Sequence, residues 1–112
     1  MESTQKYTMD NKQIMITYDL IDAVKSSESS VTWADMVHIM ERLDNEIIND
    51  STLGHVITKG GKDIFIELYF EIEEKNSYIV DHYELIDSDR FLDLMLAKRR
   101  VNLSNEAVRS II

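Results

Sequence analysis

Four carboxylates and two aromatic rings occupy alternate positions of one stretch, KDIFIELYFEIEE, which spans residues 62–74. Carboxylates can act as acids or bases, bind cations or attract a basic surface, and a tyrosine among them is a common anchor of protein interfaces. A spacing of two residues is the period of a β-strand, so all six side chains are predicted to share one face of a sheet. They are Asp63, Phe65, Glu67, Tyr69, Glu71 and Glu73.

The positions between these six side chains are apolar. They are Ile64, Ile66, Leu68, Phe70 and Ile72. An apolar row of this kind needs a hydrophobic core, so the strand is expected in a sheet with one face packed and the other in water. A sheet with one packed face and one wet face explains much of the pattern without any function. A functional interpretation requires, in addition, a partner that binds the wet face.

A basic protein is the partner that the acidic row predicts. Acidic side chains steer a cationic partner and make its binding sensitive to salt. A frequent basic surface in cells is a nucleic-acid-binding groove, which suggests mimicry of nucleic acid. One strand places carboxylates about 6.7 Å apart, whereas duplex DNA carries one charge per roughly 1.7 Å of axis, so other carboxylates would have to contribute. Glu84, Asp87, Asp81 or the acidic face of the helix that begins at Thr32 could supply them, and we add Glu84 to the six predicted docking residues.

A basic segment near the C-terminus, AKRRVNLSNEAVRSI at residues 97–111, is the second candidate. It resembles the core of a helix-turn-helix, in which apolar residues flank a tight turn and line the inner side of the second helix. It departs from that motif at position 98, where a small residue is expected. Two amphipathic helices that close a small fold explain the segment as well. The resemblance implies DNA binding through Lys98, Arg99, Arg100, Asn105 and Arg109.

Metal binding and catalysis find little support in the sequence. Asp35, His38 and Glu41 share one side of a predicted helix at three-residue steps, but one motif without a second contributing helix is weak. The chain has no cysteine. It also contains no nucleophile elbow, phosphate-binding loop or paired acid and base. We therefore expect a protein that is not an enzyme and that uses no metal or cofactor.

The charge of the chain restricts its partners. The 112 residues carry a formal net charge of −9, which disfavours nucleic acid and anionic membranes as direct partners. Residues 62–87 hold eight acidic and two basic side chains, whereas residues 88–112 hold three acidic and five basic ones. No apolar run approaches the roughly 20 residues of a membrane span, and the N-terminus does not resemble a signal peptide. A cytoplasmic location is the default expectation.

Apolar periodicity and turn signals predict the elements that must position these residues. Residues 1–10 are expected to form a flexible tail and residues 11–112 a single α+β domain. Helices are predicted over 11–26, where 13–18 also suits a short strand, and from Thr32 to the turn at 49–51. Strands at 53–58, 63–73 and 78–86 are followed by helices capped by Asp89 and Ser104. The expected fold is two N-terminal helices, a three-stranded antiparallel meander and two C-terminal helices, with the helices on one face of the sheet.

The leading hypothesis is a binding protein that occupies a basic surface of a partner and blocks its access to nucleic acid. In size, charge and composition the chain is similar to the small acidic inhibitors of phages and mobile elements, such as anti-CRISPR proteins and other DNA mimics. The alternatives are a small helix-turn-helix regulator that uses residues 97–111, and an immunity or antitoxin protein. Exposed Phe65 and Tyr69 beside an unpaired sheet edge would also permit a homodimer.

Overall fold

Strands dominate the regular structure of this chain. The computed structural model describes residues 4–26, 31–49 and 51–98. These residues form six strands, the helices α1 and α2, and a helix at 88–98 that we call the C-terminal helix. In chain order the labelled elements are β1 (Thr4–Met9), β2 (Lys12–Thr17), α1 (Tyr18–Lys25), α2 (Trp33–Met40), β3 (Ile47–Asn49), β4 (Thr52–Lys59), β5 (Lys62–Glu74) and β6 (Ser77–Ile86).

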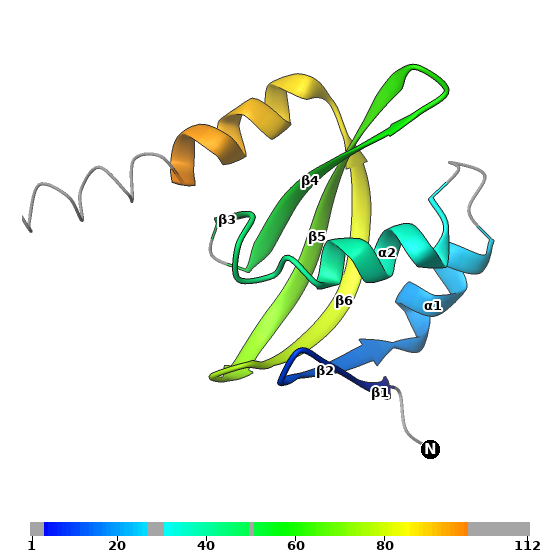
Figure 1. Ribbon diagram of the computed structural model, residues 1–112, viewed down its shortest axis with the longest axis vertical. Coiled ribbons are helices and arrows are strands. Elements are labelled where there is room, and N and C mark those ends of the chain that lie inside the picture. Colours follow the sequence, from blue (N-terminus) through cyan, green and yellow to red (C-terminus); the bar gives the residue numbers. More distant parts are fainter. Residues whose placement is uncertain (1–3, 27–30, 50, 99–112) are drawn as a thin grey trace, which may run out of the picture.

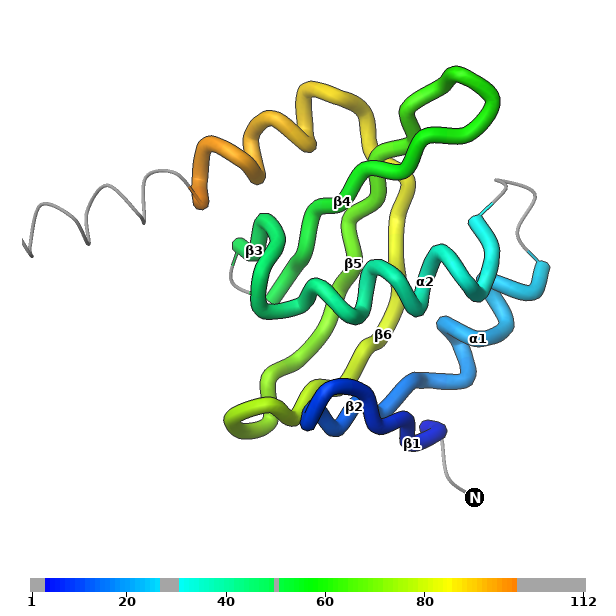
Figure 2. Tube along the Cα trace, in the orientation of Figure 1, coloured from blue at the N-terminus to red at the C-terminus, as the bar shows by residue number. Residues whose placement is uncertain are grey.

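The strands form one mixed sheet in the order β1-β2-β6-β5-β4-β3. Neighbouring strands are antiparallel except β2 and β6, which run parallel. Parallel neighbours need a crossover, and the chain leaves β2 through α1, α2 and three strands before it returns as β6. The hairpin of β4 and β5 extends beyond α1 and α2 (Figure 2). Residues with positive φ close the hairpins, namely Asp10, Asn11, Gly60, Gly61 and Asn76.

The main hydrophobic core lies between one face of the sheet, here called the inner face, and the helices α1 and α2. Figure 1 shows these two helices close together, with the C-terminal helix running separately from the end of β6. The alternate side chains Ile66, Leu68 and Phe70 of β5 are buried in this core. The other strands, the helices α1 and α2 and the segments on either side of α2 contribute Ile14, Ile16, Leu20, Val24, Val31, Met36, Ile39, Met40, Leu43, Leu53, Tyr78 and Val80.

Threonine side chains set the start of α1 and α2. Thr17 Oγ1 accepts a hydrogen bond from the backbone N–H of Leu20 at 3.2 Å. Thr32 forms a capping box with Asp35, in which each side chain accepts from the other residue's backbone N–H, at 3.2 and 2.9 Å. These bonds satisfy donors that a helix leaves unpaired in its first turn. The predicted start of α2 at Thr32 is therefore confirmed.

A buried lysine ties the turn after α2 to the sheet. Lys12 is only 6% exposed; its ammonium donates to the backbone oxygen of Glu41 at 3.0 Å and lies 3.4 Å from Asp44 Oδ2. The hydroxyl of Tyr78 donates to the other oxygen of Asp44. Burial, together with this carboxylate, raises the pKa of Tyr78 to about 12. Asp44 therefore joins β2, β6 and the end of the α2 region in one polar contact.

The C-terminal helix packs on the opposite, outer face of the sheet. Partners in an antiparallel pair share a face, so Gly54 and Glu67, which pair directly, both point outward. Leu94 is fully buried, and a Cβ added to Gly54 would lie 2.9 Å from its Cδ1. The ring of Phe91 lies 5.1 Å from that of Phe65. Because Gly54 has no side chain, Leu94 of the C-terminal helix can pack directly against the sheet at this position.

The predicted fold is wrong in its sheet and in its arrangement of helices. A six-stranded mixed sheet replaces the three-stranded meander, because β1, β2 and β3 extend it at both sides. The helices do not lie on one face, since α1 and α2 cover the inner face and the C-terminal helix covers part of the outer one. Beyond residue 98 nothing is described, so the expected last helix lies outside the described residues.

The N-terminal part also differs from the expectation. Residues 4–9 are strand β1 rather than flexible tail, because they pair with β2 along their whole length. The expected helix over 11–26 is split, and its first half is β2, as the β-favouring side chains of residues 13–18 had allowed. The next helix ends at Met40, after which turns lead to β3. No helix within the described ranges is long and apolar enough to cross a bilayer.

Replacing Gly54 by alanine tests the packing of the C-terminal helix on the outer face. The new methyl group would meet Leu94 at 2.9 Å, so we expect Gly54→Ala to lower the free energy of unfolding by about 1–3 kcal/mol. Chemical denaturation measures this value. In a Leu94→Ala background, which removes the contacting atom, the same replacement should cost much less, and equal costs in both backgrounds would contradict the packing described.

Candidate functional site

The acidic row of β5 lies on the outer face of the sheet, and the C-terminal helix divides it. Residues of the row near the middle of β5 lie beneath that helix, whereas those toward the β5–β6 turn stay open to solvent. The six predicted side chains therefore do not form one continuous docking surface. Glu67, Phe65 and Asp63 have structural contacts of their own.

Glu67 is buried, contrary to the prediction that it faces solvent. Its side chain is 2% exposed and forms a two-pronged ion pair with Arg90 of the C-terminal helix. Arg90 Nε donates to Oε1 at 3.1 Å and Nη2 donates to Oε2 at 2.8 Å. Burial by itself would raise the pKa of Glu67, but the hydrogen bonds and charge of Arg90, with smaller contributions from Tyr69 and Thr52, leave this pKa lowered. The side chain is thus an ionised anchor and not a docking group.

Phe65 and Asp63 also lie apart from the open part of the acidic row near the β5–β6 turn. Phe65 is half-buried because the ring of Phe91 covers it. Asp63 is exposed but lies near the β4–β5 turn, where its Oδ1 accepts a hydrogen bond from Thr58 Oγ1 at 2.8 Å. It is six residues along the strand from Tyr69, which corresponds to about 20 Å. It therefore does not contact the group of side chains around Tyr69.

Tyr69 and its neighbour His82 form the centre of the open part. Their rings stack with centroids 4.3 Å apart and an interplanar angle of 7°. The hydroxyl of Tyr69 donates to Glu84 Oε2 at 3.2 Å. Burial, followed by the charge of Glu67 and the contact with Glu84, raises the pKa of Tyr69 to about 12. The tyrosine is therefore a neutral donor that is held in place by a ring and by a carboxylate.

A β-bulge beside this pair brings a further carboxylate to the same place. Tyr69 pairs with His82, but the next residue, Phe70, pairs with Val80, so Asp81 has no residue opposite it. Asp81 Oδ2 lies 3.1 Å from His82 Nδ1. Its backbone oxygen accepts from Thr17 Oγ1 at 2.6 Å, which fixes the bulge against the end of β2.

We define the open acidic patch as Tyr69, Glu71, Asp81, His82 and Glu84. Glu71 and Glu84 are exposed, and Glu71 follows Tyr69 at the next outward position of β5. The patch offers three carboxylates around a stacked ring pair, which suits a cationic partner with a flat or aliphatic side chain. Glu73 is exposed one step farther along β5, beside a second irregularity in the pairing with β6.

The other residues singled out by the sequence have structural roles where they are described. Asp35 pairs with Lys59 Nζ at 2.5 Å in addition to capping α2, and His38 contacts the ring of His55 edge to face at 5.6 Å. No group of three or more potential metal ligands occurs in the described part of the chain. Lys98 donates to the backbone oxygens of Asn45 and Glu46, at 3.4 and 2.9 Å.

The remaining residues of the predicted DNA-binding segment, Arg99, Arg100, Asn105 and Arg109, lie outside the described residues. Lys98 holds the C-terminal helix against the loop before β3, so its ammonium group is engaged within the protein. The helix-turn-helix therefore stays a prediction without a structural test.

Sequence reasoning missed two residues of this face, His82 and Arg90. His82 becomes a member of the patch only through the register of β5 and β6, which a strand pattern does not specify. Arg90 follows a capping aspartate, Asp87, whose Oδ1 accepts from its backbone N–H at 2.8 Å. The sequence signal for this ion pair would have been an acidic residue within a hydrophobic strand together with an arginine in the helix that follows the sheet.

Acid titration tests the pair of Glu67 and Arg90. The pKa of Glu67 is lowered in the folded state from its ordinary value of 4.5, so its ionised form stabilises the fold above that pH. This contribution is lost as the pH falls through the folded-state pKa. We expect Glu67→Gln to lower the free energy of unfolding at neutral pH by about 1–3 kcal/mol, and to weaken its dependence on pH below about 5.

Urea denaturation at a series of pH values measures both effects. Glu71→Gln is the matched control, because it removes the same charge from an exposed position of the same strand. The control should change stability by less than about 0.5 kcal/mol. If the two variants behaved alike, Glu67 would not be the anchor described.

Comparison with known proteins gives no independent guide to the role of this face. No protein-family model, no curated protein and no solved structure matches the chain.

Proposed function

We propose that this protein is a non-enzymatic binding module that docks its open acidic patch on a basic surface of a partner protein. One observation carries the proposal: a half-buried tyrosine, stacked on His82 and bonded to Glu84, stands among three carboxylates on a face that the C-terminal helix leaves open. Tyrosine is favoured at interface centres because its ring contributes apolar area at a low cost in conformational entropy.

The charge of the whole chain supports the same partner chemistry. A net charge of −9 attracts a cationic protein over a distance of about 10 Å at moderate salt and accelerates its approach. The patch then supplies short-range contacts, since lysine or arginine side chains can pair with Glu71, Asp81 or Glu84. Arg90, whose side chain is 45% exposed, lies on the same face and would disfavour a partner cation there.

We further propose that the partner surface is a nucleic-acid-binding one and that the module acts as an inhibitor, in the manner of small acidic phage proteins. The reason is chemical, because surfaces that bind nucleic acid are much more positively charged than ordinary protein interfaces. The patch is too small to imitate a long duplex, since only three of its five residues are acidic. It suits a local block of a basic groove.

The proposal predicts which acidic residues matter for capture of a basic partner. The tagged chain is used to retain proteins from a nuclease-treated bacterial lysate, and retained proteins are eluted with a salt gradient. Glu71→Gln/Glu84→Gln should release its basic partner at clearly lower salt, with at least a tenfold loss of affinity when the isolated pair is titrated. The matched control, Asp19→Asn/Asp22→Asn, removes two charges from exposed positions of α1 and should bind nearly as the parent does.

Equal losses in both variants would mean that overall charge, and not the patch, drives binding. Replacing Tyr69 by phenylalanine then separates the ring from its hydroxyl. We expect a small change, because stacking on His82 is kept. Absence of any basic protein among the retained material would end the proposal. Glu67 is left intact throughout, since its loss would disturb the fold.

Two other functions and a homodimer are alternative hypotheses that experiment distinguishes. An immunity or antitoxin protein would use the same acidic patch against a basic toxin, so capture of a toxin and not a nucleic-acid-binding protein would favour it. Material that is retained only in the absence of nuclease treatment would favour the helix-turn-helix regulator. A homodimer through exposed strand edges would be detected by light scattering of the purified chain.

A further inference from the structure

A cleft opens on the inner side of the sheet, away from the acidic patch. It lies where β1 at the sheet edge meets α1 and the start of α2, and it encloses about 270 Å³. Its lining residues are Gln5, Tyr7, Ile16, Ile21, Val24, Lys25 and Trp33.

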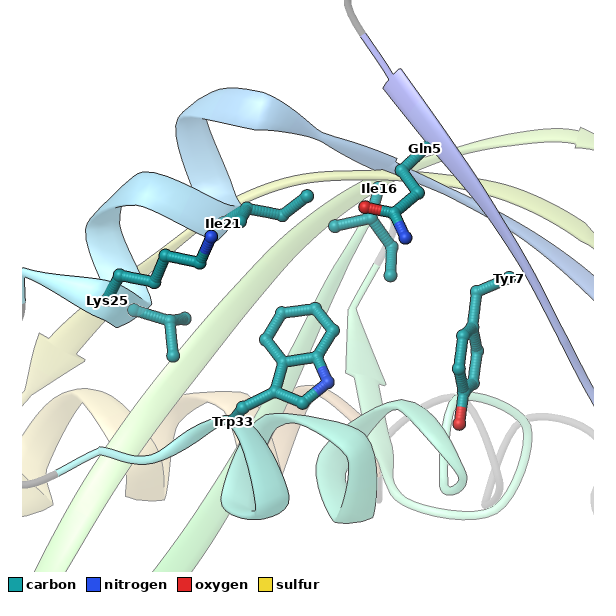
Figure 3. A pocket seen from close by; sticks show the side chains of 7 residues that line it. Gln5, Tyr7, Ile16, Ile21, Lys25 and Trp33 are labelled. Atoms are coloured by element: carbon teal, nitrogen blue, oxygen red, sulfur yellow. The ribbon is translucent and has the colours of Figure 1, made fainter.

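The floor of this cleft is apolar and its sides are aromatic. Ile16 and Val24 are core residues with exposures of 1% and 7%, and Ile21 packs against the same core. Figure 3 shows the indole ring of Trp33 standing between Lys25 and Tyr7. Trp33 remains 37% exposed, which is a large apolar area to leave in water next to a core. A ligand with an apolar body would cover it.

Besides the hydroxyl of Tyr7, which can donate or accept, three polar groups at the rim can donate hydrogen bonds. They are the ammonium group of Lys25, the amide of Gln5 and the indole N–H of Trp33. Figure 3 shows the amide of Gln5 pointing from β1 toward the cleft. Within the described residues, none of these three side chains has a hydrogen-bond or ion-pair partner. Donors without partners around an apolar floor favour a ligand whose head accepts hydrogen bonds and carries negative charge.

We propose that this cleft binds a small amphipathic carboxylate, whose aromatic or branched aliphatic body covers the indole ring of Trp33 and the apolar floor at Ile16 and Ile21 and whose carboxylate lies at Lys25. The site is separate from the open acidic patch, because the two lie on opposite faces of the sheet. It would give the protein a small-molecule ligand in addition to a protein partner, and it does not depend on the proposed docking function. The cleft is slightly smaller than most ligand pockets, so it restricts the ligand to a small molecule.

The single tryptophan of the chain makes the proposal directly measurable. Phenylpropionate is the probe, and its uncharged amide, phenylpropionamide, is the matched ligand of the same shape. We expect phenylpropionate to shift the tryptophan fluorescence and the indole N–H signal in proton–nitrogen NMR, with a dissociation constant near about 1 mM. The amide should bind about threefold more weakly, as the loss of one partly exposed ion pair implies.

Two variants connect the binding to the cleft. Lys25→Gln should bind acid and amide equally, whereas Lys62→Gln, an exposed lysine at the far β4–β5 turn, should keep the preference for the acid. Ile21→Phe fills the cleft from α1 and should weaken both ligands at least tenfold. The NMR spectrum of each variant without ligand shows whether it is folded.

Three results would overturn the proposal. The first is an indole signal that does not move with phenylpropionate up to about 10 mM, well above the expected dissociation constant. The second is equal affinity of the parent chain for acid and amide, which would remove the role of Lys25. The third is unchanged binding in a folded Ile21→Phe variant, which would place the ligand elsewhere.

Discussion

The buried carboxylate of Glu67 is the constraint on which the outer half of this structure depends. It lies directly opposite Glu84 in the β5–β6 pair and opposite Gly54 in the β4–β5 pair. Two carboxylates opposite each other repel, and a buried one without a cation is strongly unfavourable. Arg90 supplies the cation that Glu67 needs through two hydrogen bonds, and Glu84 accepts a hydrogen bond from the hydroxyl of Tyr69. To reach Glu67, Arg90 must be carried to the outer face, and the C-terminal helix that carries it packs on that face.

That helix determines which part of the sheet remains available. Phe91 and Leu94 cover the outer face around Phe65 and Gly54, so the sheet is sandwiched at that end. Toward the β5–β6 turn the same face is uncovered, and there the bulge at Asp81 places His82 against Tyr69. The open acidic patch is thus defined by the area that the described part of the helix covers and by one unpaired residue in β6. On the inner side, the cleft forms because α1 and α2 meet β1 without filling the space beside Trp33.

Several local features could be predicted because their cause is local. The alternation of β5, the turn at Gly60 and Gly61, and the Thr32–Asp35 capping box each depend on a few consecutive residues. The sheet as a whole could not be predicted in this way. β1 and β2 contain alternating residues that also suit a tail or a helix, and only pairing with each other and with β6 makes them strands. The parallel pairing of β2 with β6 joins segments some sixty residues apart. Neither segment contains a sequence pattern that indicates this pairing.

By itself the sequence determined the charge of the chain, the apolar row of β5 and the acidic row behind it, because these follow from residue type and the two-residue period of a strand. It could not decide which acidic side chains meet water. Tertiary structure decided that Glu67 is an anchor and Glu84 is exposed, although they face each other in the sheet. The physical reason is that burial depends on what covers a face, and the covering helix comes from a segment whose docking position no local pattern encodes.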